Sequence, residues 1–330
     1  MTIDEAITTL VAATLAPVTR VDPRIEVIHD LTSVVPTITE LLVAAADADQ
    51  RHPLSDQLRL DLEHGGRPGS LAVVARDEQD RVIGYTQSSP GNESTVVQLV
   101  VHPDHRDDLT TVGEPLLRLA TQVTDDLSGA DAHPVTWWVA EPDESHHRLA
   151  ADLGWSPARR LYQMRRRLPT GEPVTIDVRP FRPGDDDEAW IHVNNRAFAA
   201  HGEQGGWDLA TLRQRMGEPW FDPEGFLVHE VDGRMVGFCW TKLHDELDPV
   251  EGEIYVIGVD PDLHGAGIGR QLTLAGLDSI ARRGVTIGML FVDADNTPAV
   301  RLYERLGFSI HRTDVAFTGP PPATPPGAPA

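Results

Sequence analysis

A glycine-rich turn between a strand and a helix is the clearest chemical signal in the sequence. Residues 254–259 form a β-rich run, and Gly265, Gly267 and Gly269 follow before a helical pattern begins. Backbone N–H groups in such a turn and in the first helical turn point outward unpaired, at the positive end of the helix dipole, and glycine lets an anion approach closely. The spacing therefore indicates a phosphate site, although close helix–strand packing would also explain the glycines.

Two common phosphate-binding arrangements fit this turn poorly. A Rossmann site has its glycines early in a βαβ unit and an acidic residue about 20 positions later. Here the turn comes late, after a predicted hairpin, and the region near residue 281 is basic because of Arg282 and Arg283. A P-loop needs Gly-Lys-Ser or Gly-Lys-Thr after the glycines, and no such sequence follows. A nucleotide dehydrogenase and a kinase or ATPase are therefore disfavoured.

The elements around the turn alternate between strand and helix. The hairpin signal is Asp232-Gly233, and the helix after the turn carries Ile268, Leu272 and Ala275 on one stripe. Gly307 ends the last helix. The predicted strands are 175–178, 226–230, 235–243, 253–259 and 287–292, and the predicted helices are 185–199, about 266–282, and 298–306. This order predicts an α+β fold with a mixed sheet.

The same landmarks occur twice, about 155 residues apart, which indicates a duplicated domain. A β-rich run before His102-Pro103 matches the one before Asp260-Pro261, and a helix closing at Gly154 matches the one closing at Gly307. We predict a first domain over residues 1–168 that includes a leader of about 24 residues, a linker over 169–174, a second domain over 175–318 and a disordered tail over 319–330.

Two motifs in the second half resemble those of the GNAT acetyltransferases. The run from His264 to Gly269 matches the family's Gln/Arg-x-x-Gly-x-Gly/Ala signature except at His264. The closing motif is matched in full by Asn296, Ala299, Leu302, Tyr303, Gly307 and Phe308. The resemblance implies two tandem GNAT domains, each a mixed and mostly antiparallel sheet flanked by helices, an architecture that some schemes place in the α/β class. It also implies acetyl-CoA as the co-substrate and no metal.

The resemblance assigns the chemistry to few residues. Glu253 would accept the proton of the attacking amine, and Tyr303 would donate its phenolic proton to the sulfur of CoA, since ordinary pKa values of about 10 and 8.5 are close. A solvated strand-end carboxylate and a packing tyrosine are the alternatives. The implied acetyl-CoA site comprises Ile257, Gly258, Val259, His264, Gly265, Ala266, Gly267, Ile268, Gly269, Arg270, Phe291, Asn296 and Arg301, with oxyanion-binding N–H groups near residues 257–259.

The first copy lacks these groups. Aligning the landmarks places Thr95 at the position of Glu253 and Ala150 at the position of Tyr303. The glycine cluster is replaced by residues 107–115, which include Asp107, Asp108 and Glu114, so acidic side chains would repel a pyrophosphate. Any acetyl-CoA bound there should be weak or vestigial, at Leu99, Val100 and Val101. We expect a structural or substrate-shaping domain.

The acceptor is indicated by a narrower resemblance. The tandem layout and the runs 193–198, 201–207, 220–223 and 240–242 resemble the mycothiol synthases of actinobacteria, a family that acetylates the cysteinyl amine of cysteinyl-glucosaminyl-inositol. The resemblance assigns acceptor binding to Glu203, Lys242, Glu253 and Asp56. Exposed charges without a function are the alternative for Glu203 and Lys242. Another amine acetyltransferase, or a non-catalytic acetyl-CoA sensor, remains a different explanation of the chain.

The composition of the chain limits the kinds of partner that it can bind. A formal net charge of −23 opposes nucleic-acid binding, which relies on clustered Lys and Arg. No apolar run approaches the roughly 20 residues that span a bilayer, and the N-terminus lacks a signal-peptide pattern. The single cysteine, Cys239, lies between aromatic residues, a pattern typical of a buried hydrophobe. We therefore expect a cytoplasmic monomer that acts on a small thiol-sugar and binds no membrane.

Overall fold

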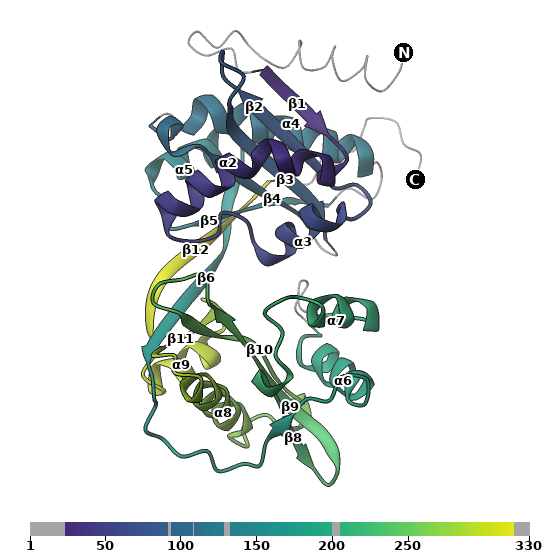
Figure 1. Ribbon diagram of the computed structural model, residues 1–330, viewed down its shortest axis with the longest axis vertical. Helices are drawn as coiled ribbons and strands as arrows, with labels where there is room; N and C mark the ends of the chain where they lie inside the picture. The colour runs from purple at the N-terminus through teal and green to yellow at the C-terminus, as the bar shows by residue number, and fades with distance from the viewer. Residues whose placement is uncertain (1–23, 92–93, 108, 129–132, 200–204, 320–330) are drawn as a thin grey trace. The chain divides into compact units, whose positions relative to one another are not determined.

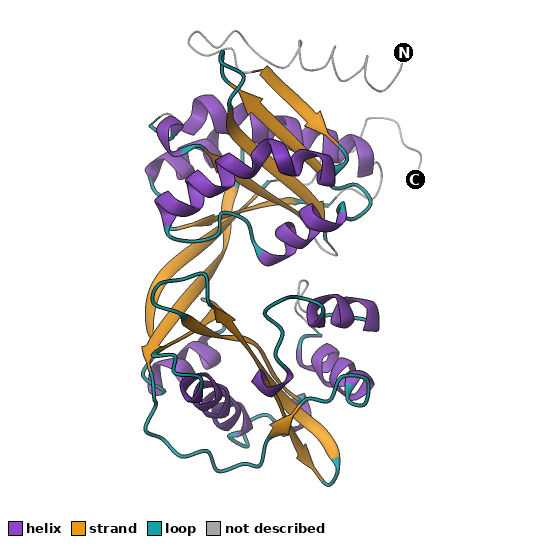
Figure 2. Ribbon diagram, viewed as in Figure 1, coloured by secondary structure: helices purple, strands orange, loops and turns teal. Residues whose placement is uncertain are grey.

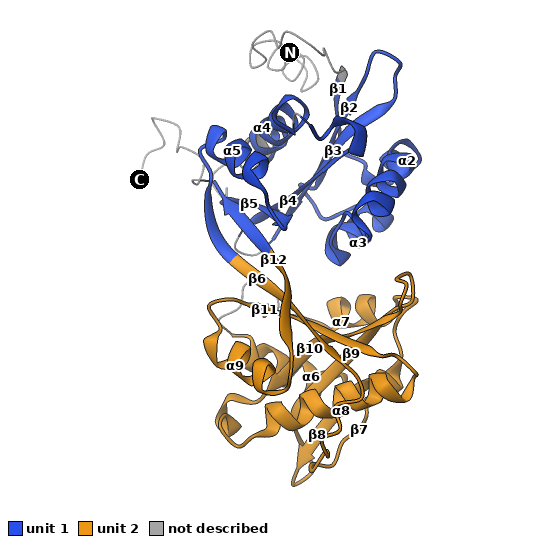
Figure 3. Ribbon diagram, turned by 90° about the vertical axis from the view of Figure 1, so that its left-hand side faces the viewer, with its two compact units in different colours: residues 1–159, 314–330 blue, residues 160–313 orange. Residues whose placement is uncertain are grey.

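The computed structural model describes residues 24–91, 94–107, 109–128, 133–199 and 205–319 (Figure 1). The predicted leader, except Arg24, and the tail beyond Gly319 lie outside the described residues. The chain divides into two compact units. Unit 1 comprises residues 1–159 and 314–330, and unit 2 comprises residues 160–313 (Figure 3).

In unit 1, two layers of helix cover a sheet. The sheet order is β1-β2-β3-β4-β5-β12, antiparallel except between β4 and β5. The elements are β1 (Arg24–Ile28), α2 (Leu31–Asp49), α3 (Asp56–His64), β2 (Leu71–Arg76), β3 (Val82–Pro90), β4 (Thr95–Val101), α4 (Leu109–Ser128), β5 (Val135–Ala140), α5 (Glu144–Asp152) and the end of β12 (Ser309–Thr318).

Alternation along β2 supplies both faces of the unit 1 core. Val73 and Ala75 pack with α4 and α5, whereas Ala72 and Val74 pack with α2 and α3. Figure 2 shows these helices on the sheet. The expectation that nothing in the chain is long and apolar enough to cross a membrane is wrong for α2, a helix of 19 residues in which a window of 18 has a mean hydropathy of 1.3. Its residues Leu31, Val34, Ile38, Leu41 and Ala45 are buried against the sheet, so the apolar stripe forms core.

Unit 2 repeats this plan. The sheet order is β6-β11-β10-β9-β8-β7, and only β10 and β11 run parallel. The elements are β6 (Ser156–Arg167), β7 (Arg179–Pro180), α6 (Asp187–Ala197), α7 (Leu209–Met216), β8 (Phe226–Val231), β9 (Arg234–His244), β10 (Glu251–Val259), α8 (Ile268–Arg282), β11 (Ile287–Asp293), α9 (Thr297–Arg305) and the start of β12. Figure 1 shows α6 and α7 on one side of β8–β10 and α8 and α9 on the other.

The compact units are not consecutive stretches of chain. Strand β6 pairs with β11 over seven residue pairs, from Leu161↔Asp293 to Arg167↔Ile287, and so forms part of the unit 2 sheet. The end of β12 pairs with β5 from Asp314↔Ala140 to Thr318↔Thr136, within unit 1. A boundary in sequence order between residues 168 and 175 would put β6 with the first unit and the end of β12 with the second.

Most predicted elements of the second half are confirmed. Asp232 and Gly233 have φ values of 52° and 73° in the turn between β8 and β9, the conformation that a tight hairpin requires. The stripe Ile268, Leu272 and Ala275 is buried in α8. The strand predicted at 175–178 is wrong, because the paired residues are Arg179 and Pro180. Val174, Ile176 and Val178 pack on the core without joining the sheet.

Candidate active site

The glycine-rich turn takes the form that an anion site needs. Gly265 and Gly267 have φ values of 84° and 81°, which favour glycine, and Gly267 is the N-cap of α8 with no side-chain capping bond. Residues 264–267 are exposed, and the first N–H groups of α8 have no partner within the helix. The ring of His264 contacts the carbonyl oxygen of Val259 at 3.3 Å. Arg270 forms an ion pair with Glu172 of the predicted linker.

Strand β10 separates from β11 just before this turn. The two strands pair in parallel only from Gly252↔Gly288 to Ile254↔Leu290, whereas β10 stays paired with β9 as far as Val259. A register shift between Ile254 and Val256 marks a bulge at Tyr255. Backbone groups of residues 257–259 on the side of β11 therefore make no ladder bonds to that strand. Ile257, Gly258 and Val259 thus lie where N–H groups can face a ligand.

Glu253 lies at the paired end of β10 with a histidine as its hydrogen-bond partner. Its carboxylate oxygen Oε2 is 2.7 Å from Nε2 of His244, and the residue is 7% exposed. Lys242 is directly opposite Glu253 in the β9–β10 ladder. The second ring nitrogen of His244 is 2.9 Å from Oε1 of Glu246. Burial is the largest single influence and opposes the charged ring, but the hydrogen bond and charge of Glu253 together with the hydrogen bond to Glu246 outweigh it, so the pKa of His244 is raised.

Lys242 is enclosed by aromatic rings. Its Nζ lies 5.0 Å from the ring centroid of Trp220 and 5.9 Å from that of Tyr255, and the residue is 6% exposed. Such contacts stabilise an ammonium group that has been removed from water. The structure therefore brings Lys242 and Glu253 together as predicted and holds both in a mostly buried, polar-and-aromatic part of unit 2.

Tyr303 approaches the strands from the other face of the sheet. It packs on Phe308, with ring centroids 5.8 Å apart, in the core cluster that includes Cys239 and Ile254. A side chain at Gly276 of α8 would collide with Cys239 and Ile254, which shows that these two point toward α8. Since strand side chains alternate, Glu253 points to the opposite face. Burial raises the pKa of the Tyr303 phenol, which stays protonated as a hydrogen-bond donor.

The remaining predicted residues are placed as follows. Phe291 on β11 is half-buried, with Arg312 over its ring at 5.7 Å. Asn296 caps α9 by accepting from the N–H of Ala299 at 3.3 Å, and Arg301 is an exposed residue of that helix. Glu203 lies outside the described residues. Asp56 is the first residue of α3 in unit 1 and is half-buried.

Unit 1 repeats the strands without the chemistry. Strand β4 pairs with β3 from Gly84↔Val101 to Pro90↔Thr95 with no bulge. Because the bulge in β10 adds one residue, the sixth pair of this ladder, Ser89↔Val96, corresponds to Lys242↔Glu253, and the predicted equivalence of Thr95 is wrong by one position. Neither Val96 nor Ser89 can replace the carboxylate or the ammonium group.

The structure also places the other residues predicted for the first copy. The N–H of Trp155 donates to Ala150, as that of Phe308 donates to Tyr303, so Ala150 occupies the tyrosine position. Leu99 is half-buried, and Val100 and Val101 are buried. In the run that replaces the glycines, Asp108 lies outside the described residues, and Glu114 forms an ion pair with Arg118 at 2.6 Å.

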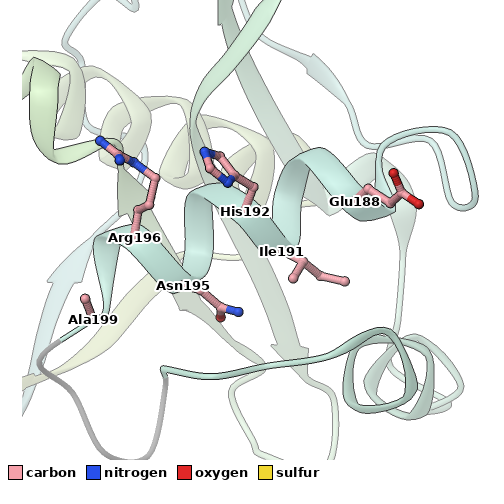
Figure 4. A pocket seen from close by; sticks show the side chains of 6 residues that line it. All are labelled: Glu188, Ile191, His192, Asn195, Arg196 and Ala199. Carbon is pink, nitrogen blue, oxygen red and sulfur yellow. The ribbon is translucent and has the colours of Figure 1, made fainter.

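A shallow hollow of about 520 Å³ follows helix α6 in unit 2 (Figure 4). Two of its lining residues stabilise the surrounding fold. The Asn195 side chain donates to the carbonyl oxygen of Trp207 and accepts from its N–H, and the Arg196 guanidinium donates to the Asp260 carboxylate at 3.0 Å. Its lining residues are Glu188, Ile191, His192, Asn195, Arg196 and Ala199. None of the predicted catalytic residues lines it.

His244 was not predicted from the sequence. The sequence carried one signal for it: Lys242 and His244 alternate at the end of a mostly apolar strand. That strand pairs with the strand that carries Glu251 and Glu253, so charged side chains of the two strands can meet on one face. Trp220 lies in a run that carries the family resemblance, but its ring and that of Tyr255 were not expected to enclose Lys242.

Comparison with known proteins agrees with this arrangement. The model of the acetyltransferase (GNAT) family matches residues 188–308, which include Glu253, the glycine-rich turn and Tyr303. A mycothiol acetyltransferase of Thermobispora bispora is 42% identical over 85% of this chain and 94% of that protein. The chain belongs to the mycothiol acetyltransferase family. Relatives with the same name in Thermomonospora curvata and Streptomyces coelicolor are 42% and 39% identical over 87% and 89% of this chain, and over 95% of each of those proteins.

Solved structures support the fold of this mycothiol acetyltransferase family member. A GCN5-related N-acetyltransferase from Sphaerobacter thermophilus superposes with a TM-score of 0.66 at 24% identity, covering 89% of this chain and 95% of that one. A tandem GNAT protein from the clavulanic acid biosynthesis pathway gives the same TM-score at 18% identity, covering 90% and 98%. The predicted tandem α+β GNAT fold is confirmed.

Proposed function

We propose that this chain transfers the acetyl group of acetyl-CoA to the cysteinyl amine of cysteinyl-glucosaminyl-inositol, giving mycothiol and CoA. The observation that carries the proposal is the 42% identity to a mycothiol acetyltransferase over 85% of the chain. The site in unit 2 supports the chemistry, because it combines a buried carboxylate, an exposed anion-binding turn and a buried phenol. The lone buried cysteine fits our proposal that the protein is a cytoplasmic monomer.

The turn from His264 to Arg270 would hold the pyrophosphate of acetyl-CoA. Its exposed N–H groups and the dipole of α8 favour an anion, and a chain with a net charge of −23 offers little other attraction. The stretch of β10 that does not pair with β11 would then run beside the pantetheine arm, and the N–H groups of residues 257–259 that face that side would be available to the thioester oxygen.

The reaction needs three groups in sequence. Glu253 accepts a proton from the amine as its nitrogen bonds to the thioester carbon, and backbone N–H groups of β10 stabilise the oxyanion. The carbon–sulfur bond then breaks, and the thiolate accepts a hydrogen bond or a proton from Tyr303. Since Glu253 and Tyr303 face opposite sides of the sheet, the thioester has to lie where β10 and β11 no longer pair.

Acceptor recognition would fall to charged groups near the base. Lys242, opposite Glu253, and Glu253 itself can bond hydroxyl and amine groups of a cysteinyl sugar. The family resemblance adds Glu203 and Asp56. For Glu203→Ala we expect the KM for the sugar to rise about tenfold, as for the loss of one charged hydrogen bond, with unchanged acetyl-CoA affinity in calorimetry. An unchanged KM would remove Glu203 from the acceptor site.

Substituting Gly267 with leucine should weaken acetyl-CoA binding at least tenfold, because a side chain at φ = 81° strains the turn and blocks anion approach to the backbone. Gly284 is a matched control, since it follows the other end of α8 with φ = 83° and, like Gly267, has no atom within 4 Å of the position that a Cβ would occupy. Gly284→Leu should lose similar stability and keep the wild-type Kd in calorimetry. Equal losses of affinity in the two variants would move the CoA site away from the turn.

The function is tested by following CoA formation from acetyl-CoA across a panel of amines: the cysteinyl sugar, the same sugar without cysteine, a polyamine, an aminoglycoside and a lysine peptide. CoA should be separated chromatographically, because the cysteinyl sugar itself carries a thiol. We expect the highest kcat/KM for the cysteinyl sugar. A preference for another amine would leave only the broader N-acetyltransferase assignment, and binding of acetyl-CoA without turnover of any amine would indicate a sensor.

A further inference from the structure

Three side chains form a continuous hydrogen-bonded row from the buried part of unit 2 to its surface. Glu253 contacts Nε2 of His244 at 2.7 Å, and Nδ1 of His244 contacts Glu246 at 2.9 Å. The side chains of Glu253 and His244 are 10% and 13% exposed, whereas that of Glu246 is 57% exposed. His244 and Glu246 belong to β9 and the turn after it, and Glu253 to β10.

This geometry defines the protonation state of the ring. A carboxylate oxygen can only accept a hydrogen bond, and a carboxylate lies at hydrogen-bond distance from each ring nitrogen. A neutral imidazole has one N–H and would turn a lone pair toward one of the two carboxylates. Only the imidazolium donates to both, so the row is satisfied with His244 charged.

We propose that His244 is a positioning residue that holds Glu253 as an oriented carboxylate, with oxygen Oε2 engaged by the ring and Oε1 left to accept the proton of the acceptor amine. The inference rests on the proposed function, in which Glu253 is the general base. His244 does not touch the reacting atoms and acts through Glu253. Glu246 in turn fixes the ring and stabilises its charge from the solvent side.

Other charges around His244 reduce the stabilisation of its imidazolium form without cancelling it. Lys242, on the same face of β9, opposes the imidazolium, as does burial, whereas Glu253 and Glu246 favour it. Glu251 lies opposite His244 in the ladder, but its Oε1 is paired with Arg165 at 2.9 Å. The net result is a raised pKa for His244.

The sign of the pH dependence follows. Because the folded-state pKa of His244 is raised, its stabilising contribution is fully present below the ordinary histidine pKa of about 6.5 and disappears as the pH rises through the raised value. Over the same range Glu253 loses its cationic partner. Removing the imidazolium should therefore matter most on the acid side of the activity profile, where His244 is charged.

The test uses the full-length protein and three variants: His244→Gln, Glu246→Gln and, as matched control, Asp245→Asn, which removes one negative charge from the same exposed turn. For each, kcat and KM for both substrates are measured against pH. We expect His244→Gln to lower kcat about tenfold near neutrality and to move the acid limb of the kcat profile to higher pH, with unchanged acetyl-CoA affinity. Glu246→Gln should move the limb the same way by less, and Asp245→Asn should not move it.

Several outcomes overturn the inference. An unmoved acid limb in both His244→Gln and Glu246→Gln contradicts it, as does a loss of kcat that is uniform across pH and follows a loss of thermal stability. If His244→Gln does not bind acetyl-CoA and is therefore misfolded, Glu246→Gln alone decides. A Glu253→Gln variant measured in parallel separates the proposed base role of Glu253 from the proposed positioning role of His244. Wild-type turnover of Glu253→Gln would contradict the base role. An inactive Glu253→Gln beside a His244→Gln with normal kinetics would contradict only the role of His244.

Discussion

Glu253→Gln is expected to lower turnover about 100-fold or more at neutral pH while leaving the affinity for acetyl-CoA unchanged. The substitution keeps the size of the side chain and an oxygen for the His244 ring, but it removes the group that can take a proton. The deficit should shrink at high pH, because an amine that is already neutral depends less on a base. This pH dependence separates a lost base from a lost contact.

The control for Glu253→Gln lies two residues away on the same strand. Glu251 is 4% exposed and pairs with Arg165, so Glu251→Gln should lower the free energy of unfolding without changing the pH profile of kcat. Initial rates over a pH series, with chromatographic detection of CoA, provide the comparison. Wild-type rates for Glu253→Gln near neutrality would return Glu253 to a structural role.

Tyr303→Phe is expected to fold normally and to lose about 100-fold in turnover, since phenylalanine keeps the contact with Phe308 but cannot donate to the departing sulfur. The ordinary pKa values of a phenol and a thiol are close enough for proton transfer. Burial raises the pKa of Tyr303 and widens that difference, so hydrogen-bond donation to the thiolate takes a larger share of the effect than complete proton transfer. The loss should be independent of pH across the assay range.

Tyr162→Phe is the matched control for Tyr303→Phe. Tyr162 on β6 packs against the same core cluster, so its variant also removes one hydroxyl group from this part of unit 2. It should keep wild-type turnover in single-turnover measurements of the chemical step. Equal effects of the two substitutions, or no effect of Tyr303→Phe, would assign Tyr303 to packing.

Turns and helix ends could be predicted from the sequence, because they depend on the conformational preferences of one or two residues. The hairpin at Asp232-Gly233 follows from positive φ at both residues, and the start of α8 and the end of α9 follow from Gly267 and Gly307. Once β9 and β10 pair as a hairpin, Lys242 and Glu253 lie opposite each other and the glycine-rich turn is left exposed at the end of β10. The segment predicted as a strand at 175–178 packs Ile176 and Val178 on the core without joining the sheet, because burial of alternate side chains does not require ladder hydrogen bonds.

Pairing between distant segments could not be predicted from local patterns. Nothing in the sequence of β6 shows that it joins β11, or that the end of β12 joins β5. This changes one expectation: a protein cut at residue 168 loses β6, exposes the edge of β11 and is not a folded test of unit 2. The sequence also gives no sign of the bulge at Tyr255. Because that bulge adds one residue to β10, alignment by sequence spacing matched Thr95 to Glu253, whereas the strand pairing matches Val96 to it.

The proposed function requires that the full-length protein acetylates the nitrogen of the cysteinyl sugar. The decisive experiment is mass spectrometry of the product formed from acetyl-CoA and that sugar, with a thiol-alkylating reagent added after the reaction. We predict a product one acetyl group heavier whose thiol still reacts with the reagent, formed in a one-to-one ratio with CoA and absent with Glu253→Gln on the same time scale. A product whose thiol is blocked by the acetyl group, or an unmodified sugar beside rapid acetylation of another amine, would contradict the proposal.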